Sequence, residues 1–195
     1  MKNRLFVISL ISLTVSIFCF LLYFLSDISA RDKTKKQEVV EETSYFKITQ
    51  YDSMYYYYIF NKNHDLVKKD GPFVKKPHII LADDGIIKFT LQTGTGIGTQ
   101  WGYFYDIDTN KFSEIFQSIY DQNNQQVAYG DLRKVIVRDI FDRSKYYREI
   151  SSFSKPFSEV AEPIVDVKFV NGGTSIEISY LTGVNYEIMT EVLEL

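Results

Sequence analysis

The stretch SIEISY, from Ser175 to Tyr180, places apolar or aromatic side chains at alternate positions with polar residues between them. A nearby segment, IVDVKFV from Ile164 to Val170, alternates in the same way around Asp166 and Lys168. Because successive side chains of a β-strand point to opposite faces of a sheet, this period of two is typical of a strand with one buried face. The two segments therefore predict paired strands near the end of the chain.

Short turn-forming segments separate further strand-like stretches along the chain. Asn, Asp and Gly dominate these segments, since such residues tolerate positive φ or bond their own backbone. The segments are NKNHD at 61–65, ADDG at 82–85, DIDTNK at 106–111, DRSK at 142–145, NGG at 171–173 and TGVN at 182–185. Outside the apolar N-terminal segment, no window has a convincing helical apolar period. The sequence therefore predicts an all-β, antiparallel domain.

The strands and turns fall into four repeated hairpin units. These units span 45–70, 77–116, 126–150 and 164–195, and the segment 151–163 is the main connection without a strand pattern. Repeated meanders of this kind are typical of propeller blades and related β arrays. Four weakly similar units are few for ring closure, so an open or two-layered antiparallel sheet stays an alternative to a small propeller.

The N-terminal segment, residues 1–30, predicts a membrane anchor. After Lys2 and Arg4, the run from Leu5 to Leu25 contains no charged residue. As a helix this run is about 31 Å long, close to the thickness of a bilayer's hydrocarbon core. We expect an uncleaved transmembrane helix. A cleaved secretory signal stays an alternative, because ISA at Ile28–Ala30 is a weak cleavage site.

The charged segment 31–44 predicts a stalk, either solvated coil or a short helical extension, before a folded domain at 45–195. Basic residues on the two sides of the apolar run favour a cytoplasmic domain by simple count. A long chain that follows a first apolar segment with a basic start is, however, normally translocated. We therefore expect a single-pass membrane protein with an extracytoplasmic C-terminal domain, or a secreted domain if the signal is cleaved.

Composition excludes several function classes. Hydrophobic residues make up 45% of the chain, so it is not disordered as a whole. Net charge is −3, and the part after residue 30 carries −4, which is a poor match for nucleic-acid phosphates. The one cysteine, Cys19, lies inside the apolar run, so the predicted domain contains no disulfide, thiol nucleophile or cysteine metal site.

Alternate glycines at Gly94, Gly96 and Gly98 resemble a phosphate-binding loop at first sight. A Walker loop requires Lys followed by Ser or Thr, and a dinucleotide loop requires a helix after the glycines. The strand-like segment TQWGYFYDI follows instead, with no lysine before Lys111. The glycines therefore predict a hairpin connection or bulge.

The turn DIDTNK places oxygen-bearing side chains at Asp106, Asp108 and Asn110, the first ligand positions of an EF-hand loop. Such a loop also needs Gly at its sixth position and Glu at its twelfth, where this chain has Lys111 and Gln117. We interpret the segment as a hairpin turn. A calcium turn of another kind stays open.

Catalytic candidates are few. The two histidines, His64 and His78, lie in a polar turn and at a strand start, without the spacing of a metal pair. Asp139 lies in an apolar run and is a candidate for a partly buried acid of the kind that hydrolases use. Pairing with Arg138 or Arg143 is the more ordinary arrangement for such a carboxylate.

Four consecutive tyrosines give the clearest hint of a surface. In a strand, Tyr55 and Tyr57 face one way while Tyr56 and Tyr58 face the other, so one pair is expected in the core. Exposed tyrosines suit a protein partner or a glycan. Tyr56, Tyr58 and the single tryptophan, Trp101, are therefore the candidate ligand residues. The alternative is cross-strand packing, and for Trp101 a place in the core.

Three segments carry a resemblance: YDIDTNKFSE at 105–114, VRDIFDRSKYYRE at 137–149 and ISYLTGVNYEIMTEVLEL at 178–195. They look like recurrent phrases of uncharacterised, small, membrane-anchored or secreted β-rich proteins of Gram-positive gut bacteria, and the likeness covers most of 45–195. The resemblance implies export and an all-β domain, and it brings no assigned activity and no catalytic residues.

These observations favour a membrane-anchored, extracytoplasmic binding or interaction module without catalysis. We expect no cofactor, and as partners the membrane together with a protein or a cell-envelope glycan. Two alternatives stay open. One is an exported hydrolase or metal-dependent enzyme that uses Asp139 or the pair Asp106 and Asp108, and the other is a sensor or inhibitor of a neighbouring membrane protein.

Overall fold

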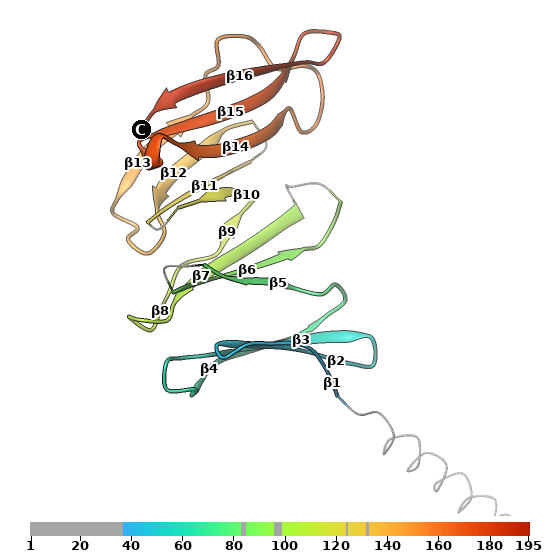
Figure 1. Ribbon diagram of the computed structural model, residues 1–195. Helices are drawn as coiled ribbons and strands as arrows, with labels where there is room; N and C mark the ends of the chain where they lie inside the picture. Colours follow the sequence, from blue (N-terminus) through green and yellow to red (C-terminus); the bar gives the residue numbers. More distant parts are fainter. Residues whose placement is uncertain (1–36, 83–84, 96–98, 124, 132) are drawn as a thin grey trace, which may run out of the picture.

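The computed structural model describes residues 37–82, 85–95, 99–123, 125–131 and 133–195. Within them the chain forms four antiparallel sheets, each a meander of strands that follow one another in sequence (Figure 1). The prediction of an all-β antiparallel fold built from repeated hairpin units is confirmed. A short 3₁₀ turn, η2 (Asn171–Gly173), connects two strands of the last sheet.

Each sheet corresponds to one continuous part of the chain. The first contains β1 (Glu38–Glu42), β2 (Phe46–Tyr51), β3 (Met54–Phe60) and β4 (Leu66–Phe73). The second contains β5 (His78–Leu81), β6 (Ile86–Gln92), β7 (Gln100–Asp106) and β8 (Lys111–Phe112), with β9 (Phe116–Gln117) also paired to β7. The third contains β10 (Ile119–Gln122), β11 (Gln126–Gly130), β12 (Val135–Asp139) and β13 (Tyr146–Ile150), and the fourth β14 (Ile164–Val170), β15 (Ser175–Thr182) and β16 (Glu187–Glu194).

The sheets stack face to face in chain order, as propeller blades do (Figure 1). One hydrophobic core joins the first sheet to the second, another the second to the third, and another the third to the fourth. Among the residues that the structure describes, no core cluster joins the first sheet to the fourth. The described array is therefore open, with a terminal sheet at each end.

The second sheet is buried on both faces. Ile87, Phe89 and Leu91 of β6 pack in the core shared with the first sheet, whereas Ile86 and Phe104 pack in the core shared with the third. Alternate residues of one strand thus serve two different cores. This explains why β6 and β7 read as nearly continuous apolar runs.

Aromatic rings dominate the core between the first and second sheets. The ring of Phe89 lies 4.5 Å from that of Tyr57 and 4.9 Å from that of Tyr103, between ring centroids. The Tyr103 hydroxyl donates to the Tyr57 oxygen at 2.9 Å, and Tyr57 donates to Asp70 Oδ2 at 3.3 Å. Burial raises the pKa of both phenols, so they stay neutral and the buried hydroxyls are satisfied.

Two unit boundaries differ from those predicted. Strand β1 lies inside the segment predicted as a stalk, because it pairs with β2 at the edge of the first sheet. The third sheet begins with β10, before the predicted start at residue 126. Neither strand has a clear period of two, since β1 is mostly exposed and β10 is short.

The predicted turns connect strands as expected. The glycine-rich segment joins β6 to β7, where the Thr93 N–H donates to the Thr99 carbonyl at 3.0 Å. Gly96 and Gly98 themselves lie outside the described residues, as do the predicted anchor and residues 31–36 of the predicted stalk. Over the described part of the chain, no helix reaches the length and apolarity that a bilayer span requires.

Candidate interaction surface

The outer face of the first sheet, which points away from the second sheet, carries two of the predicted ligand residues. We call it the tyrosine face. By strand register it contains Val39 and Glu42 of β1, Lys47 and Thr49 of β2, Tyr56 and Tyr58 of β3, and Lys69 of β4. Tyr56 and Tyr58 are half-buried among their strand neighbours. They lie at the middle of a sheet surface that no other sheet of the described residues covers.

The Tyr58 side chain is held in place from two sides. Gln37 Nε2 donates to the Tyr58 hydroxyl oxygen at 3.0 Å and to Thr49 Oγ1 at 2.6 Å. The ammonium of Lys69 lies 5.3 Å from the centre of the Tyr58 ring. Partial burial raises the pKa of Tyr58, but the hydrogen bonds from Gln37 and Thr49 and the charge of Lys69 outweigh it and lower the pKa overall. These contacts hold the Tyr58 ring and hydroxyl in one orientation on the face.

The tyrosine face has an excess of positive charge. Lys47 and Lys69 lie on it against one carboxylate, Glu42. Lys47 Nζ lies 3.1 Å from Glu42 Oε1, in an ion pair that is largely solvated. Because the charges of Lys47 and Glu42 balance each other, the net positive charge of the face comes from Lys69. The sequence analysis did not single out the two lysines, although the strand period places them beside the tyrosines.

The other members of the tyrosine run point inward, as the alternation predicts. Tyr57 is fully buried, and Tyr55 packs against the core shared with the second sheet. Trp101 also lies in that core, with its ring 5.5 Å from Phe89 and 6.5 Å from Phe73. The structure thus places Tyr56 and Tyr58 side by side and separates them from Trp101. Trp101 lies in the core, the alternative position given for it in the sequence analysis.

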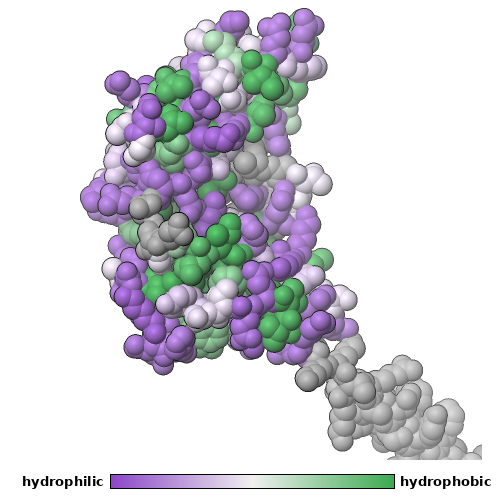
Figure 2. Space-filling model, in the orientation of Figure 1, coloured by the Kyte–Doolittle hydropathy of each residue, from purple (hydrophilic) through white to green (hydrophobic). Residues whose placement is uncertain are grey.

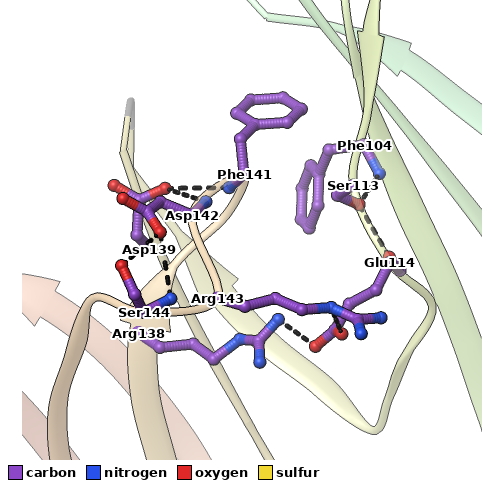
Figure 3. A network of polar contacts seen from close by, with 9 residues as sticks. All are labelled: Phe104, Ser113, Glu114, Arg138, Asp139, Phe141, Asp142, Arg143 and Ser144. Carbon is purple, nitrogen blue, oxygen red and sulfur yellow. Dashed lines mark hydrogen bonds and ion pairs between the residues drawn. The ribbon is translucent and has the colours of Figure 1, made fainter.

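Asp139 is the strongest catalytic candidate of the sequence, and the structure places it in a turn (Figure 3). It lies at the end of β12 and is almost fully buried. Its Oδ1 accepts hydrogen bonds from the backbone N–H groups of Phe141 and Asp142, each at 2.8 Å. These bonds fix the turn that leads into β13, which is the ordinary role of an Asp at a hairpin.

The expected pairing of Asp139 with an arginine is not found among its described contacts. Both Arg138 and Arg143 form ion pairs with Glu114 instead (Figure 3). Successive residues of a strand point to opposite faces, so Arg138 and Asp139 cannot easily share one partner. Glu114 lies far away in sequence, in the segment between β8 and β9, and no local pattern indicates it.

The Glu114 ion pairs connect the second sheet to the third. The Arg138 side chain is only 12% exposed and that of Glu114 21%. The Arg138 guanidinium lies 4.9 Å from the ring centre of Phe116 and 5.8 Å from that of Tyr129, so it stacks on the core between these sheets. Burial and the neighbouring Arg143 lower its pKa. The arrangement is that of a structural clamp.

The other polar candidates also have local roles. Asp106 Oδ1 accepts from the backbone N–H groups of Asp108 and Thr109, at 2.8 and 3.1 Å, and so closes the hairpin turn between β7 and β8. Asp108 forms an ion pair with Lys62. His64 Nδ1 lies 3.3 Å from the Ser44 carbonyl oxygen. In the parts of the chain that the structure covers, no cluster of three or more His, Cys, Asp or Glu is placed to hold a metal ion.

Comparisons with known proteins identify only distant structural likenesses. No protein-family model matches the chain, and no curated protein matches it in sequence. Hsv2 of Kluyveromyces lactis with a complete loop 6CD is similar with 8% identity and a TM-score of 0.32, over 82% of this chain and 74% of that one. A second Hsv2 structure from the same organism is similar with 9% identity and a TM-score of 0.29, over 82% of this chain and 73% of that one. At these values the likeness carries no inference about function.

Proposed function

We propose that this protein is a non-catalytic binding module that engages a protein partner through the tyrosine face. The observation that carries the proposal is the pair Tyr56 and Tyr58 on a terminal sheet face, with Tyr58 held by Gln37 and Lys69. A sheet face inside the array is covered by a neighbouring sheet, whereas this one offers ordered aromatic area to solvent.

The chemistry of the face suits a protein. Tyrosine supplies a large, rigid and amphipathic contact area, and a side chain that is already held loses little entropy on binding. The face is a pleated sheet surface, which matches the flat shape of protein interfaces better than that of a small-molecule site, usually a concave pocket. The excess lysine charge favours a partner with carboxylates opposite Lys47 and Lys69.

The proposal places the module outside the cell membrane, held by the apolar segment Leu5–Leu25. The length of that segment and the basic residues before it support an anchor. The resemblance to anchored or secreted β-rich proteins of Gram-positive bacteria supports the same location. An anchored module meets its partners at the membrane surface, where a binding face at the end of the array nearest the anchor in sequence is well placed.

Site-specific photocrosslinking in the membrane-anchored full chain tests the proposal. A benzoylphenylalanine at Tyr58 is expected to give a discrete covalent adduct with a protein. The matched control carries the same group at Tyr147, an exposed tyrosine of β13 in the third sheet. Adducts from Tyr58 that are no stronger than those from Tyr147 would contradict the proposal, and saturable binding of a cell-envelope glycan in their place would assign the face to a glycan.

A further inference from the structure

The fourth sheet, at the other end of the array, also has an outer face without a covering sheet among the described residues. Apolar side chains lie on it. Ile188 of β16 is 66% exposed and Val192 is 55% exposed. Leu181 of β15 is paired with Ile188 across the strands, so the apolar residues of both strands share this face. Contiguous exposed apolar patches on a surface mark sites of protein interaction.

Carboxylates surround these apolar residues, and we call this surface the acidic face. Strand register places Glu177 opposite Lys168 and Val192, and Asp166 and Glu194 on the same side of the sheet. Lys168 forms an ion pair with Asp166. The face thus carries three carboxylates against one lysine, which is an excess of negative charge.

We propose that the acidic face of one copy of the chain docks on the tyrosine face of a second copy. This proposal rests on the proposed function and names the partner of the same site. The tyrosine face has two lysines against one glutamate, and the acidic face has the opposite excess. Apolar or aromatic side chains lie among the charges on both, so the two surfaces complement each other in charge and in polarity.

The strands of the two faces are also of similar length. The tyrosine face lies on strands of 6 to 8 residues in β2, β3 and β4, and the acidic face on strands of 7 and 8 residues in β14, β15 and β16. Within the chain, successive sheets already pack face to face through a hydrophobic core. Docking between copies would repeat that packing and would cover both terminal faces.

The contact is heterologous, since it joins two different faces. Each copy offers one face of each kind, so two copies that make both contacts form a closed pair, and copies that make one contact each form a chain. Either product raises the mass above that of a single 22.8 kDa chain. A contact of one face with itself would respond only to charge reversal on that face, and charge reversal on the other face would leave it unchanged.

Light scattering on the detergent-solubilised full chain tests the proposal by charge reversal. Wild-type protein is expected to associate as its concentration rises, and salt is expected to weaken the association. The variant K47E/K69E makes the tyrosine face acidic, and E177K/E194K makes the acidic face basic. Each variant alone is expected to need about tenfold more protein for half-association, because like charges then face each other.

Mixing the two variants gives the decisive result. An equimolar mixture is expected to recover association, because each contact between the two different variants joins opposite charges again. The pair K145E and E159K reverses exposed charges away from both faces and is expected to leave association unchanged. Circular dichroism confirms that each variant is folded before its mass is measured.

The outcomes separate this inference from the proposed function. Wild-type protein that stays monomeric, or a mixture that does not recover association, overturns docking between copies. A Tyr58 crosslink to a different protein in that case leaves the proposed function standing. A Tyr58 crosslink to the acidic face of a second copy supports both, and an absence of Tyr58 adducts in a chain that associates without charge dependence contradicts both.

Discussion

The second and fourth sheets are both antiparallel meanders, but they differ in what lies against them. The second has a neighbouring sheet on each face, and adjacent residues are buried in the middle of both β6 and β7. The fourth packs on the third with one face, and β15 alternates strictly between buried and half-buried residues after its first two positions. The alternation of β15 therefore reflects one covered face, and the apolar runs of β6 and β7 reflect two covered faces.

The same comparison applies to the polar groups. Inside the array, Tyr57 pairs with Tyr103 and Arg138 pairs with Glu114 between neighbouring sheets. On the two terminal faces the ion pairs lie nearer to solvent, as Lys47 with Glu42 and Lys168 with Asp166. Figure 2 shows a largely hydrophilic surface in the view of Figure 1, with hydrophobic residues gathered over part of the first two sheets. Substitutions at internal sheets should therefore mainly lower stability, whereas substitutions at the terminal faces should mainly weaken association.

The largest expected effect comes from the core between the first two sheets. Phe89→Ala should destabilise the domain by about 3–5 kcal/mol, because it removes a fully buried ring that contacts two tyrosines and Trp101. Ile188→Ala, on the acidic face, should change stability by less than about 0.5 kcal/mol in dilute protein. Denaturant unfolding monitored by fluorescence measures both. Equal losses would show that the fourth sheet is covered on both faces.

A smaller loss is expected at the clamp between the second and third sheets. Glu114→Gln leaves the half-buried Arg138 and the adjacent Arg143 without their carboxylate, and should cost about 1–3 kcal/mol. The matched control, Glu159→Gln, alters an exposed carboxylate and should cost almost nothing. If Glu114→Gln leaves the free energy of unfolding unchanged, the Glu114 ion pairs do not stabilise the contact between these sheets.

The covered face of the fourth sheet supplies a pH-dependent contribution. Glu191 accepts hydrogen bonds from the Ser154 backbone N–H at 2.9 Å, from Ser154 Oγ at 2.6 Å, and from the Tyr180 hydroxyl. Partial burial raises the pKa of Glu191, but these bonds outweigh it and lower the pKa below its ordinary value of 4.5. The stability that Glu191 contributes is therefore complete above about pH 4.5 and is lost as the pH falls through the lower, folded-state pKa.

Glu191→Gln tests this contribution. The variant should be less stable than wild type by about 1 kcal/mol at neutral pH, and the difference should shrink as the pH falls below about 4. Urea unfolding across this pH range measures it. A difference that stays constant from neutral to acidic pH would contradict the assigned role of the carboxylate.

A small effect on stability is expected at the tyrosine face, where the effect on binding is expected to be large. Tyr58→Ala should change the free energy of unfolding by about 0.5–1 kcal/mol, because the side chain is only half-buried. The same change should weaken association or partner capture by about tenfold or more, as expected for a central aromatic contact. Tyr147→Ala is the control and should leave association unchanged.

Much of the fold follows from the sequence. The turn segments and the strand period locate most of the hairpins, and the alternation of Tyr55 to Tyr58 correctly separates core from surface. Strand β1 is missed because an exposed edge strand needs no apolar residues, and its sequence reads as a charged linker. The stacking of the sheets cannot be predicted from the local sequence pattern, because that pattern does not show which sheet faces pack against each other.

The candidate surface could be predicted only in part. The tyrosines are visible in the sequence, but Lys69 and Gln37 join them through strand pairing and a long-range hydrogen bond. Trp101 is a candidate by its aromatic side chain, but it lies on a strand of a sheet that is buried on both faces. Residue type alone cannot distinguish a terminal sheet from an internal one.

Hydroxyl-radical footprinting of the full chain tests the central claim, that both terminal sheets have an open outer face in the single chain. In dilute protein we expect oxidation at Tyr58 and Ile188 and protection at Tyr103 and Phe89. At concentrations where copies associate, Tyr58 and Ile188 should become protected together. Protection of Tyr58 and Ile188 at every concentration, as strong as that of Tyr103, would show that the two faces are covered within one chain and would contradict the account.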